Sequence, residues 1–162
     1  WHAPDAKVPF ADSIGAIAEA RRQGKIRFVG LSNVSSEQIE EAINIVPIAS
    51  VQNRYGFHHR EPEKDGVLGK CRELGITFLP YSPLGGASGA KSIASDGVLA
   101  QIANELGVSP QRVVLAWLLA KYDKMIPIPG VSRIETLEDS AGAADVVLSE
   151  EQQSRLNNAV TA

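Results

Sequence analysis

The chain has 162 residues, of which 44% are hydrophobic and 22% are charged, and its formal net charge is −3. This balance is typical of a globular protein, and the mild acidity argues against an electrostatic nucleic-acid interface. No hydrophobic run approaches the length of a membrane span, so we expect no membrane partner. The single cysteine, Cys71, excludes an internal disulfide, and we expect a cytoplasmic protein in which Cys71 is a buried structural thiol.

Hydrophobic spacing and capping residues predict helices that alternate with short strands. In chain order, the pattern predicts a helix from Asp12 or Ser13 to Gly24, a strand over Ile26–Leu31, a helix from Ser35 to Pro47, a strand over Ile48–Val51, a helix over Lys64–Leu74, a strand over Ile76–Leu79, helices that begin at Asp96 and Ser109, a strand over Met125–Ile128, and helices that begin at Ser132 and Ser149. The serines at 35, 132 and 149 each precede a Gln or Glu by three residues, which is the spacing of a capping box. The longer connections, 54–63 and 82–95, are candidate ligand loops.

The four predicted strands are short, mostly hydrophobic and not cleanly alternating, which is typical of parallel strands buried on both faces. Their regular alternation with helices predicts an α/β architecture. A complete (β/α)8 barrel typically takes about 250 residues. We therefore expect a (β/α)8 TIM-barrel type fold with only about the second half of the barrel present, made of four parallel strands and a strand remnant at Trp1-His2. Residues 1–162 then form a single partial domain, the C-terminal portion of a larger protein.

Polar groups follow each predicted strand, and in a barrel such strand ends gather on the face that carries the active site. Ser32, Asn33 and Gln52 suit a ligand carboxamide, although each could instead hold loop backbone. Tyr81 could stack on a flat heteroaromatic ring or serve as a core aromatic. Arg133 stands at the predicted start of a helix, where backbone N–H groups and a fixed cation favour phosphate. Together these groups indicate an aromatic carboxamide that carries a phosphate.

Four ordered motifs resemble the aldo-keto reductase superfamily, and the resemblance covers nearly the whole chain. They are Gly30-Leu31-Ser32-Asn33, Ser50-Val51-Gln52-Asn53-Arg54-Tyr55, Pro80-Tyr81-Ser82-Pro83-Leu84-Gly85 and Ile128-Pro129-Gly130. Trp1-His2-Ala3-Pro4-Asp5 resembles the end of that family's fourth strand. The resemblance implies an NADP(H)-dependent oxidoreductase that reduces aldehydes or ketones by hydride transfer, with a small-molecule carbonyl compound as its partner.

The resemblance also implies residue roles, which differ along the chain. His2 matches the active-site histidine that orients and polarises the carbonyl. Ser32, Asn33 and Gln52 match the groups that hold the nicotinamide amide, and Tyr81 matches the ring that stacks on nicotinamide. Ser82 and Leu84 match the loop beside the pyrophosphate. The segment that grips the adenosine 2′-phosphate and adenine contains Gly130, Ser132, Arg133 and Asp139.

The chain departs from the family pattern in ways that affect the expected chemistry. Ser140 stands where many members have an asparagine that contacts adenine. The family's general-acid tyrosine and its aspartate and lysine partners lie on earlier strands that this chain does not contain, so we expect the chain alone to be inactive. The alternative is a non-catalytic, cofactor-sensing or interaction module. Unpaired barrel edges favour self-association, and the adjacent His58 and His59 have no further ligands at metal-binding spacing, so we expect no metal.

Overall fold

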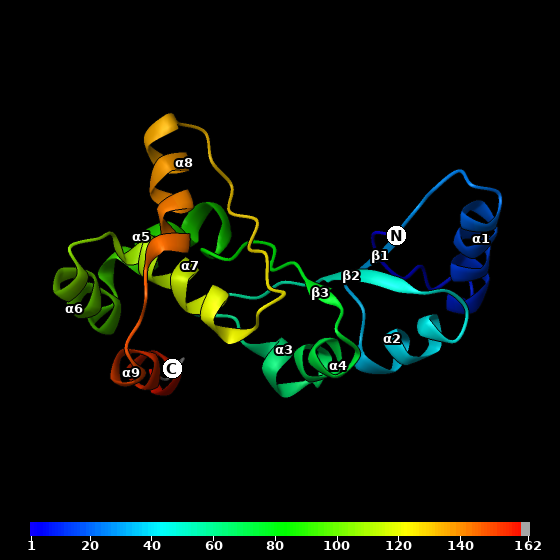
Figure 1. The fold of residues 1–162 in the computed structure, drawn as a ribbon, viewed down its shortest axis with the longest axis horizontal. Helices are drawn as coiled ribbons and strands as arrows, with labels where there is room; N and C mark the ends of the chain where they lie inside the picture. Colours follow the sequence, from blue (N-terminus) through cyan, green and yellow to red (C-terminus); the bar gives the residue numbers. More distant parts are fainter. Residues whose placement is uncertain (160–162) are drawn as a thin grey trace. The chain divides into compact units, whose positions relative to one another are not determined.

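The computed structural model describes residues 1–159, without the side chains of residues 87, 88 and 90. The chain separates into two compact units (Figure 1). The first unit holds Trp1–Arg54 and Glu61–Leu79, and the second holds Tyr55–Arg60 and the chain from Pro80 onward. The chain therefore enters the second unit twice, and residues 55–60 belong to it although elements of the first unit flank them in the sequence.

The first unit is a small α/β layer. Its elements are α1 (Phe10–Arg22), β1 (Val29–Ser32), α2 (Ser36–Ile43), β2 (Ile48–Gln52), α3 (Glu61–Lys64), α4 (Val67–Leu74) and β3 (Thr77–Phe78). The strands form one parallel sheet in the order β1-β2-β3. Ser32 at the end of β1 lies beside Gln52 at the end of β2, so the register brings two predicted site residues together.

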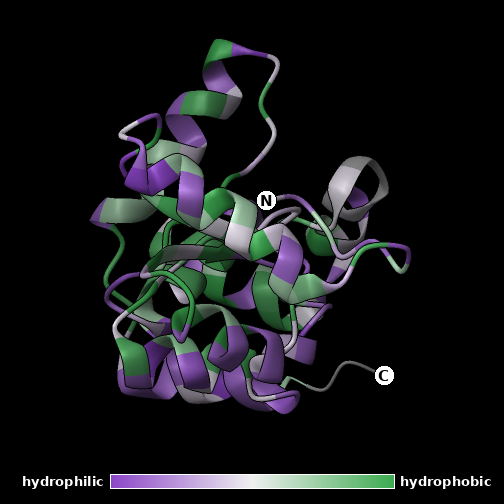
Figure 2. Cartoon of the chain, turned by 90° about the vertical axis from the view of Figure 1, so that its right-hand side faces the viewer, coloured by the Kyte–Doolittle hydropathy of each residue, from purple (hydrophilic) through white to green (hydrophobic). Residues whose placement is uncertain are grey.

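The second unit is mainly helical. Its elements are α5 (Gly86–Ser95), α6 (Gly97–Leu106), α7 (Pro110–Lys121), α8 (Ile134–Ala141), the 3-10 helix η1 (Gly142–Asp145) and α9 (Glu150–Asn158). Six consecutive residues of α7, from Val113 to Leu118, are buried, so this helix forms the centre of the unit. Hydrophobic residues dominate the buried positions. Figure 2 shows that the helices of the chain carry both hydrophilic and hydrophobic residues.

The prediction of four parallel strands is wrong for the last strand. Met125–Ile128 contains no strand and takes part only in isolated bridges at Met125 and Ile128. The bridge at Ile128 is parallel and joins it to Tyr81, and the Ile128 N–H donates to the Pro80 carbonyl at 3.1 Å. Prolines at 127 and 129 explain this result, because proline has no N–H to donate to a ladder. Ile126 and Ile128 are 55% and 41% exposed, so this segment is not buried on both faces either. Residues 1 and 2 also form no strand, although the Trp1 amino group donates to the Gly30 carbonyl at 3.0 Å.

Local capping signals predicted several helix starts correctly. The capping boxes at Ser35 and Ser149 are both present, and Asp96 and Ser109 cap α6 and α7. The box predicted at Ser132 is wrong, because Arg133 is the extended N-cap residue and α8 begins one residue later, with no side-chain cap.

Three other helix boundaries also differ from the expectation. Helix α1 begins at Phe10, with Pro9 at its N-cap, so neither Asp12 nor Ser13 caps it. The single helix expected over 64–74 is interrupted at Gly66, whose φ of +83° separates α3 from α4. The connection 82–95, expected as a loop, contains α5.

Cys71 is fully buried on α4, as the sequence predicts. Its neighbours on the same helix, Val67 and Leu68, are buried as well. Burial raises the pKa of the Cys71 thiol to about 12, because the thiolate loses its hydration inside the unit. Within the described part of the chain, no helix combines the length and the hydrophobicity that crossing a bilayer requires.

A charged side chain organises the second unit. Arg60 is only 9% exposed, and its guanidinium donates to the carbonyls of Phe57, Leu156 and Asn157 at 3.0, 2.7 and 2.8 Å. The same group lies 4.7 Å from the centre of the Trp117 ring. A buried charge is tolerated when hydrogen bonds satisfy it, and the last carbonyls of a helix favour a cation. Arg60 therefore joins residues 57–60 to both α7 and α9.

Two glycine-to-alanine substitutions should change stability in opposite directions. At Gly56 a Cβ atom would overlap the Pro83 carbonyl oxygen, whereas at Gly69, on an exposed part of α4, it would meet nothing within 4 Å. We expect Gly56→Ala to lower the free energy of unfolding by ~1–3 kcal/mol through overpacking. Gly69→Ala, the matched control, should raise it by ~0.5–1 kcal/mol through helix propensity. Urea denaturation measures both, and equal effects would contradict the close approach at Gly56.

Cys71 should react slowly in the folded chain, because the thiolate is the reactive form. An ordinary cysteine has a pKa of about 8.5, against about 12 in the fold. At pH 8 we expect alkylation on the order of a thousandfold slower than in the unfolded chain. The free energy of unfolding should also fall as the pH rises from about 8.5 towards 12, because in that range the unfolded chain alone releases the proton. Iodoacetamide labelling with and without urea, followed by mass spectrometry, checks the first expectation, and equal labelling rates would contradict it.

Candidate functional site

Four predicted site residues lie together in the first unit. A depression of about 370 Å³ is lined by Trp1, His2, Gly30, Leu31, Ser32, Ser50, Gln52 and Leu79. Asn33 joins this group through its side-chain amide, which donates to the His2 carbonyl at 2.9 Å and to Ser32 Oγ at 3.1 Å. The ends of β1 and β2 therefore bring His2, Ser32, Asn33 and Gln52 to one place.

The loop after β1 is held in an unusual conformation. The Gln52 carbonyl accepts both the Ser32 hydroxyl at 2.8 Å and the Asn33 N–H at 3.0 Å. Asn33 has a φ of +55°, in the left-handed region that non-glycine residues rarely adopt. Such strain persists only where the surroundings determine it, and it gathers at binding sites. Ser32 and Asn33 thus have structural partners as well as places at the candidate site.

The amide side chains of Gln52 and Asn53 differ in their partners. The Asn53 side chain bridges Val34, donating to its carbonyl at 2.7 Å and accepting from its N–H at 3.1 Å. The Gln52 carboxamide, by contrast, lines the depression and has no hydrogen-bond partner among residues 1–159. Gln52 can therefore offer both a donor and an acceptor to a ligand. Sequence reasoning gave Asn53 no role. Its position directly after β2 was the one feature that could have indicated this bridge to Val34.

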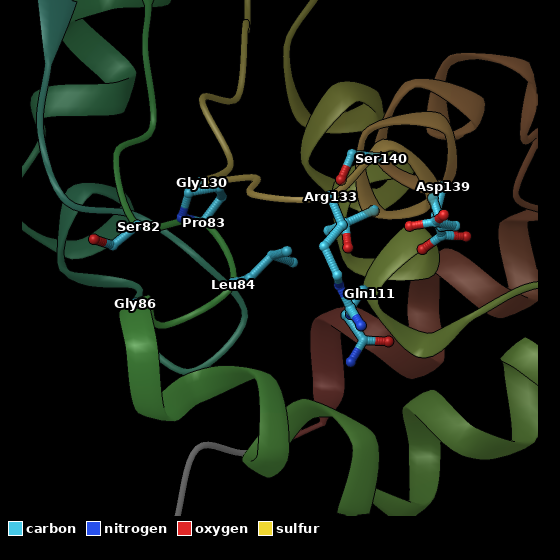
Figure 3. Close-up of a pocket in the computed structure, with 11 residues that line it drawn as sticks. Ser82, Pro83, Leu84, Gly86, Gln111, Gly130, Arg133, Asp139 and Ser140 are labelled. Atoms are coloured by element: carbon cyan, nitrogen blue, oxygen red, sulfur yellow. The ribbon is translucent and has the colours of Figure 1, made fainter.

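A second pocket, of about 650 Å³, lies within the second unit (Figure 3). It is lined by Ser82, Pro83, Leu84, Gly86, Gln111, Gly130, Arg133, Glu135, Thr136, Asp139 and Ser140. Five of the predicted site residues therefore share it: Ser82, Leu84, Gly130, Arg133 and Asp139. Tyr81 and Ser132 do not line this pocket, although both belong to the same unit.

One side of the pocket is the loop over residues 82–86. The Gly85 N–H donates to the Ser82 carbonyl at 2.9 Å, which closes a turn directly before α5. Ser82 has a φ of +49°, and Asn33 is the one other non-glycine residue with positive φ in the described chain. The loop is also tightly supported, because a Cβ atom at Gly56 or Gly89 would overlap the carbonyl of Pro83 or Leu84.

The opposite side of the pocket is the start of α8. Arg133 is its N-cap residue, and the extended backbone there lets the Arg133 carbonyl accept the first helical bond, from Leu137 at 3.1 Å. The Arg133 side chain is exposed and makes no ion pair with the described residues. Figure 3 shows it extending beside Gln111. This side therefore offers a guanidinium to an anionic ligand.

Asp139 has structural partners that the sequence did not reveal. Ser109 Oγ donates to Asp139 Oδ2 at 2.5 Å, and the Arg112 guanidinium donates to Asp139 Oδ1 at 3.1 Å. Ser109 also caps α7 by accepting the Arg112 N–H at 3.0 Å. Sequence reasoning identified Ser109 as a cap but missed Arg112, because its partner Asp139 lies 27 residues later in the chain. It also missed Gln111, which lines the pocket.

The two pockets differ in the chemistry that they can support. The first offers hydroxyl, carboxamide and imidazole groups from Ser32, Gln52 and His2. The second combines the Arg133 cation with the carboxylates of Glu135 and Asp139. Within the part of the chain that the structure describes, no cluster of three or more His, Cys, Asp or Glu side chains could hold a metal ion.

Known proteins with similar sequences are oxidoreductases. An uncharacterised oxidoreductase of Schizosaccharomyces pombe is 40% identical over 157 residues, which cover 96% of this chain and 49% of that protein. Pyridoxine 4-dehydrogenase of Escherichia coli is 37% identical over 145 residues, which cover 90% of this chain and 49% of that enzyme. The chain thus spans about half the length of the curated relatives it matches.

The fold is shared with solved aldo-keto reductases. The crystal structure of an aldo-keto reductase from Klebsiella pneumoniae in complex with NADPH superposes with a TM-score of 0.87, at 24% identity, over 99% of this chain and 57% of that one. The sequence profile of the aldo/keto reductase family matches residues 1–161. This match covers almost the whole chain, as the ordered motifs at the strand ends lead one to expect, and the chain therefore belongs to the aldo/keto reductase family.

Proposed function

We propose that this chain carries the NADP(H)-binding part of an oxidoreductase that reduces aldehydes or ketones. The observation that carries the proposal is the second pocket, where the predicted phosphate-side residues Ser82, Leu84, Gly130, Arg133 and Asp139 share one cavity. These positions come from two separate stretches of sequence, 82–84 and 130–139, so their convergence supports a common ligand. The NADPH bound to the Klebsiella pneumoniae relative is consistent with this choice.

The first pocket is our proposed place for the nicotinamide amide. The Gln52 carboxamide would hold it directly, because its donor and acceptor groups have no partners among the described residues. Ser32 would contribute acceptor capacity, since its hydroxyl hydrogen already goes to the Gln52 carbonyl. Asn33 would act together with Ser32, to which it is hydrogen-bonded. Tyr81 remains our proposal for the ring that stacks on nicotinamide.

The second pocket would hold the phosphate groups and the adenosine. Ser82 and Leu84 lie on the turn before α5, where the Ser82 hydroxyl has no hydrogen-bond partner among residues 1–159. Arg133 would meet the 2′-phosphate through its guanidinium N–H groups. The pocket is open beside Gly130, where even an added Cβ atom would meet nothing within 4 Å. Ser132 is exposed just before Arg133, and we propose that it contacts the same phosphate.

NADPH, when bound, supplies the hydride for carbonyl reduction. His2, at the rim of the first pocket, would orient and polarise the substrate carbonyl by donating a hydrogen bond to its oxygen. A proton must also reach that oxygen, and histidine alone does not provide the tyrosine, lysine and aspartate set that the family resemblance implies. We therefore propose that residues 1–162 are one part of a (β/α)8 barrel and form a single partial domain that depends on further strands for turnover.

Exposed hydrophobic side chains support a second proposal, that this chain associates with itself or with other barrel strands. Strand β1 is an edge of the three-stranded sheet, and Phe28, which directly precedes it, is 76% exposed. On α8 no residue is buried, and Ile134 is 71% exposed. Edge strands and hydrophobic patches of this kind favour pairing with another chain.

A cytoplasmic location stays a proposal, which the buried free thiol of Cys71 supports.

Arg133→Ala should remove the preference of the chain for NADPH over NADH. A charge-assisted hydrogen bond to phosphate contributes ~1.5–3 kcal/mol, so we expect NADPH binding to weaken by about tenfold or more while NADH binding changes little. Arg155→Ala is the matched control, because Arg155 lies in the same unit and pairs with Glu105 rather than lining the pocket. Isothermal titration of each variant with both cofactors measures the preference. An equal loss for NADPH and NADH would rule out the proposed contact.

The chain by itself should not reduce carbonyl compounds at a useful rate. Loss of the proton donor typically costs ~10²–10⁴ in rate, and loss of the remaining barrel removes part of the orientation of the reacting groups. NADPH consumption with a broad aldehyde panel measures the turnover, and light scattering on the same samples measures the oligomeric state. Steady turnover by a monomer would contradict both the missing acid and the proposed association, whereas NADPH binding without turnover is the expected result.

A further inference from the structure

Arg112 binds Asp139, one of the charged residues that line the second pocket. It stands in the first turn of α7, and its Nε atom donates to the Asp139 carbonyl at 3.0 Å and to Asp139 Oδ1 at 3.1 Å. Its Nη2 atom forms the ion pair with the same carboxylate at 3.1 Å. The Asp139 carbonyl is one of the last in α8, where the intrahelical ladder leaves carbonyls without a partner. Arg112 therefore caps a carbonyl near the C-terminus of α8 and also neutralises the carboxylate of Asp139.

The backbone that follows α8 is shaped around this guanidinium. A Cβ atom at Gly142 would lie 2.6 Å from the Arg112 Cζ atom, which is closer than real Cβ atoms approach. Gly142 has an ordinary helical φ of −61°, so its lack of a side chain serves this close approach and not a left-handed turn. The guanidinium is thus fixed from several sides, as a residue that positions a binding site must be.

The ion pair between Arg112 and Asp139 changes the net charge that a ligand in the pocket would meet. Arg133 is the cation of the pocket lining, and Glu135 and Asp139 are its carboxylates. A phosphate ligand would therefore meet more negative than positive charge if Asp139 were unpaired. Asp139 is only partly exposed, so solvent screens its charge incompletely. The Arg112 contact removes this repulsion without placing a second guanidinium in the pocket.

We propose that Arg112 is a positioning residue for cofactor selection, which neutralises and orients Asp139 so that the pocket accepts the 2′-phosphate of NADPH. The inference rests on the proposed function, because that function assigns the pocket to the phosphate end of the cofactor. It adds a residue that acts through Asp139 and does not touch the ligand. It also revises the role expected for Asp139, whose oxygens are engaged by Ser109 and Arg112.

The test is a charge rescue measured with two ligands, NADPH and NADH, by isothermal titration. We expect Arg112→Gln to weaken NADPH binding by about tenfold and NADH binding by less, with a difference that shrinks at high salt. Adding Asp139→Asn to that variant should restore NADPH binding, because no unpaired carboxylate remains. Arg155→Gln is the matched control, since it breaks the Arg155–Glu105 ion pair in the same unit and should leave both affinities unchanged.

The outcomes separate this inference from the proposed function. If the unsubstituted chain binds no NADPH, the proposed function fails and the role of Arg112 fails with it. If the unsubstituted chain binds NADPH but Arg112→Gln keeps the same preference for it, the proposed function stands and the role of Arg112 is overturned. A loss that Asp139→Asn does not rescue would also overturn the role. Where thermal melting shows that Arg112→Gln is unfolded, Arg112→Lys, which keeps the charge, must retain the NADPH preference.

Discussion

The arrangement of the second unit depends on the buried guanidinium of Arg60. Its three carbonyl partners belong to residues 57, 156 and 157, so one side chain joins segments that lie nearly the whole unit apart in sequence. Stacking on Trp117 fixes it further. Because Phe57 is held in this way, the neighbouring Gly56 backbone lies directly against the Pro83 carbonyl. Arg60 thus supports the turn that places Ser82 and Leu84 in the second pocket, although Arg60 itself does not line that pocket.

The two pockets, one in each unit, hold their functional groups by different interactions. In the first unit, the parallel register places Ser32 beside Gln52, and a single carbonyl oxygen holds the following turn. The hydrogen bonds of Ser32 and Asn33 there join neutral groups. In the second unit, the ion pair with Asp139 and the close approach of Gly142 hold the Arg112 guanidinium in place. Neutral amides suit a carboxamide, and a balanced set of charges suits a phosphate, so each environment agrees with the end of the cofactor that we assign to it.

Each unit contains one non-glycine residue with strained backbone. Asn33 and Ser82, the two non-glycine residues with positive φ in the described chain, each belong to a turn that follows a strand-like segment. Each was selected from sequence as a binding residue, although nothing in a sequence reports a positive φ at asparagine or serine. In both cases a backbone hydrogen bond holds the conformation: the Asn33 N–H donates to the Gln52 carbonyl on the neighbouring strand, and the Gly85 N–H donates to the Ser82 carbonyl across the turn. The strain therefore supports the assignment independently of the motifs.

The sequence alone determined the features whose causes are local. The caps at Ser35, Asp96, Ser109 and Ser149 follow from bonds to residues two or three positions away, and the order of motifs was enough to identify the family. Only the tertiary structure decided the features that join distant residues. It showed that residues 125–128 make isolated bridges instead of a strand and that Asp139 is paired with Arg112, 27 residues earlier. A strand or an ion pair needs a partner that folding brings close, and neither propensity nor spacing specifies which partner that is.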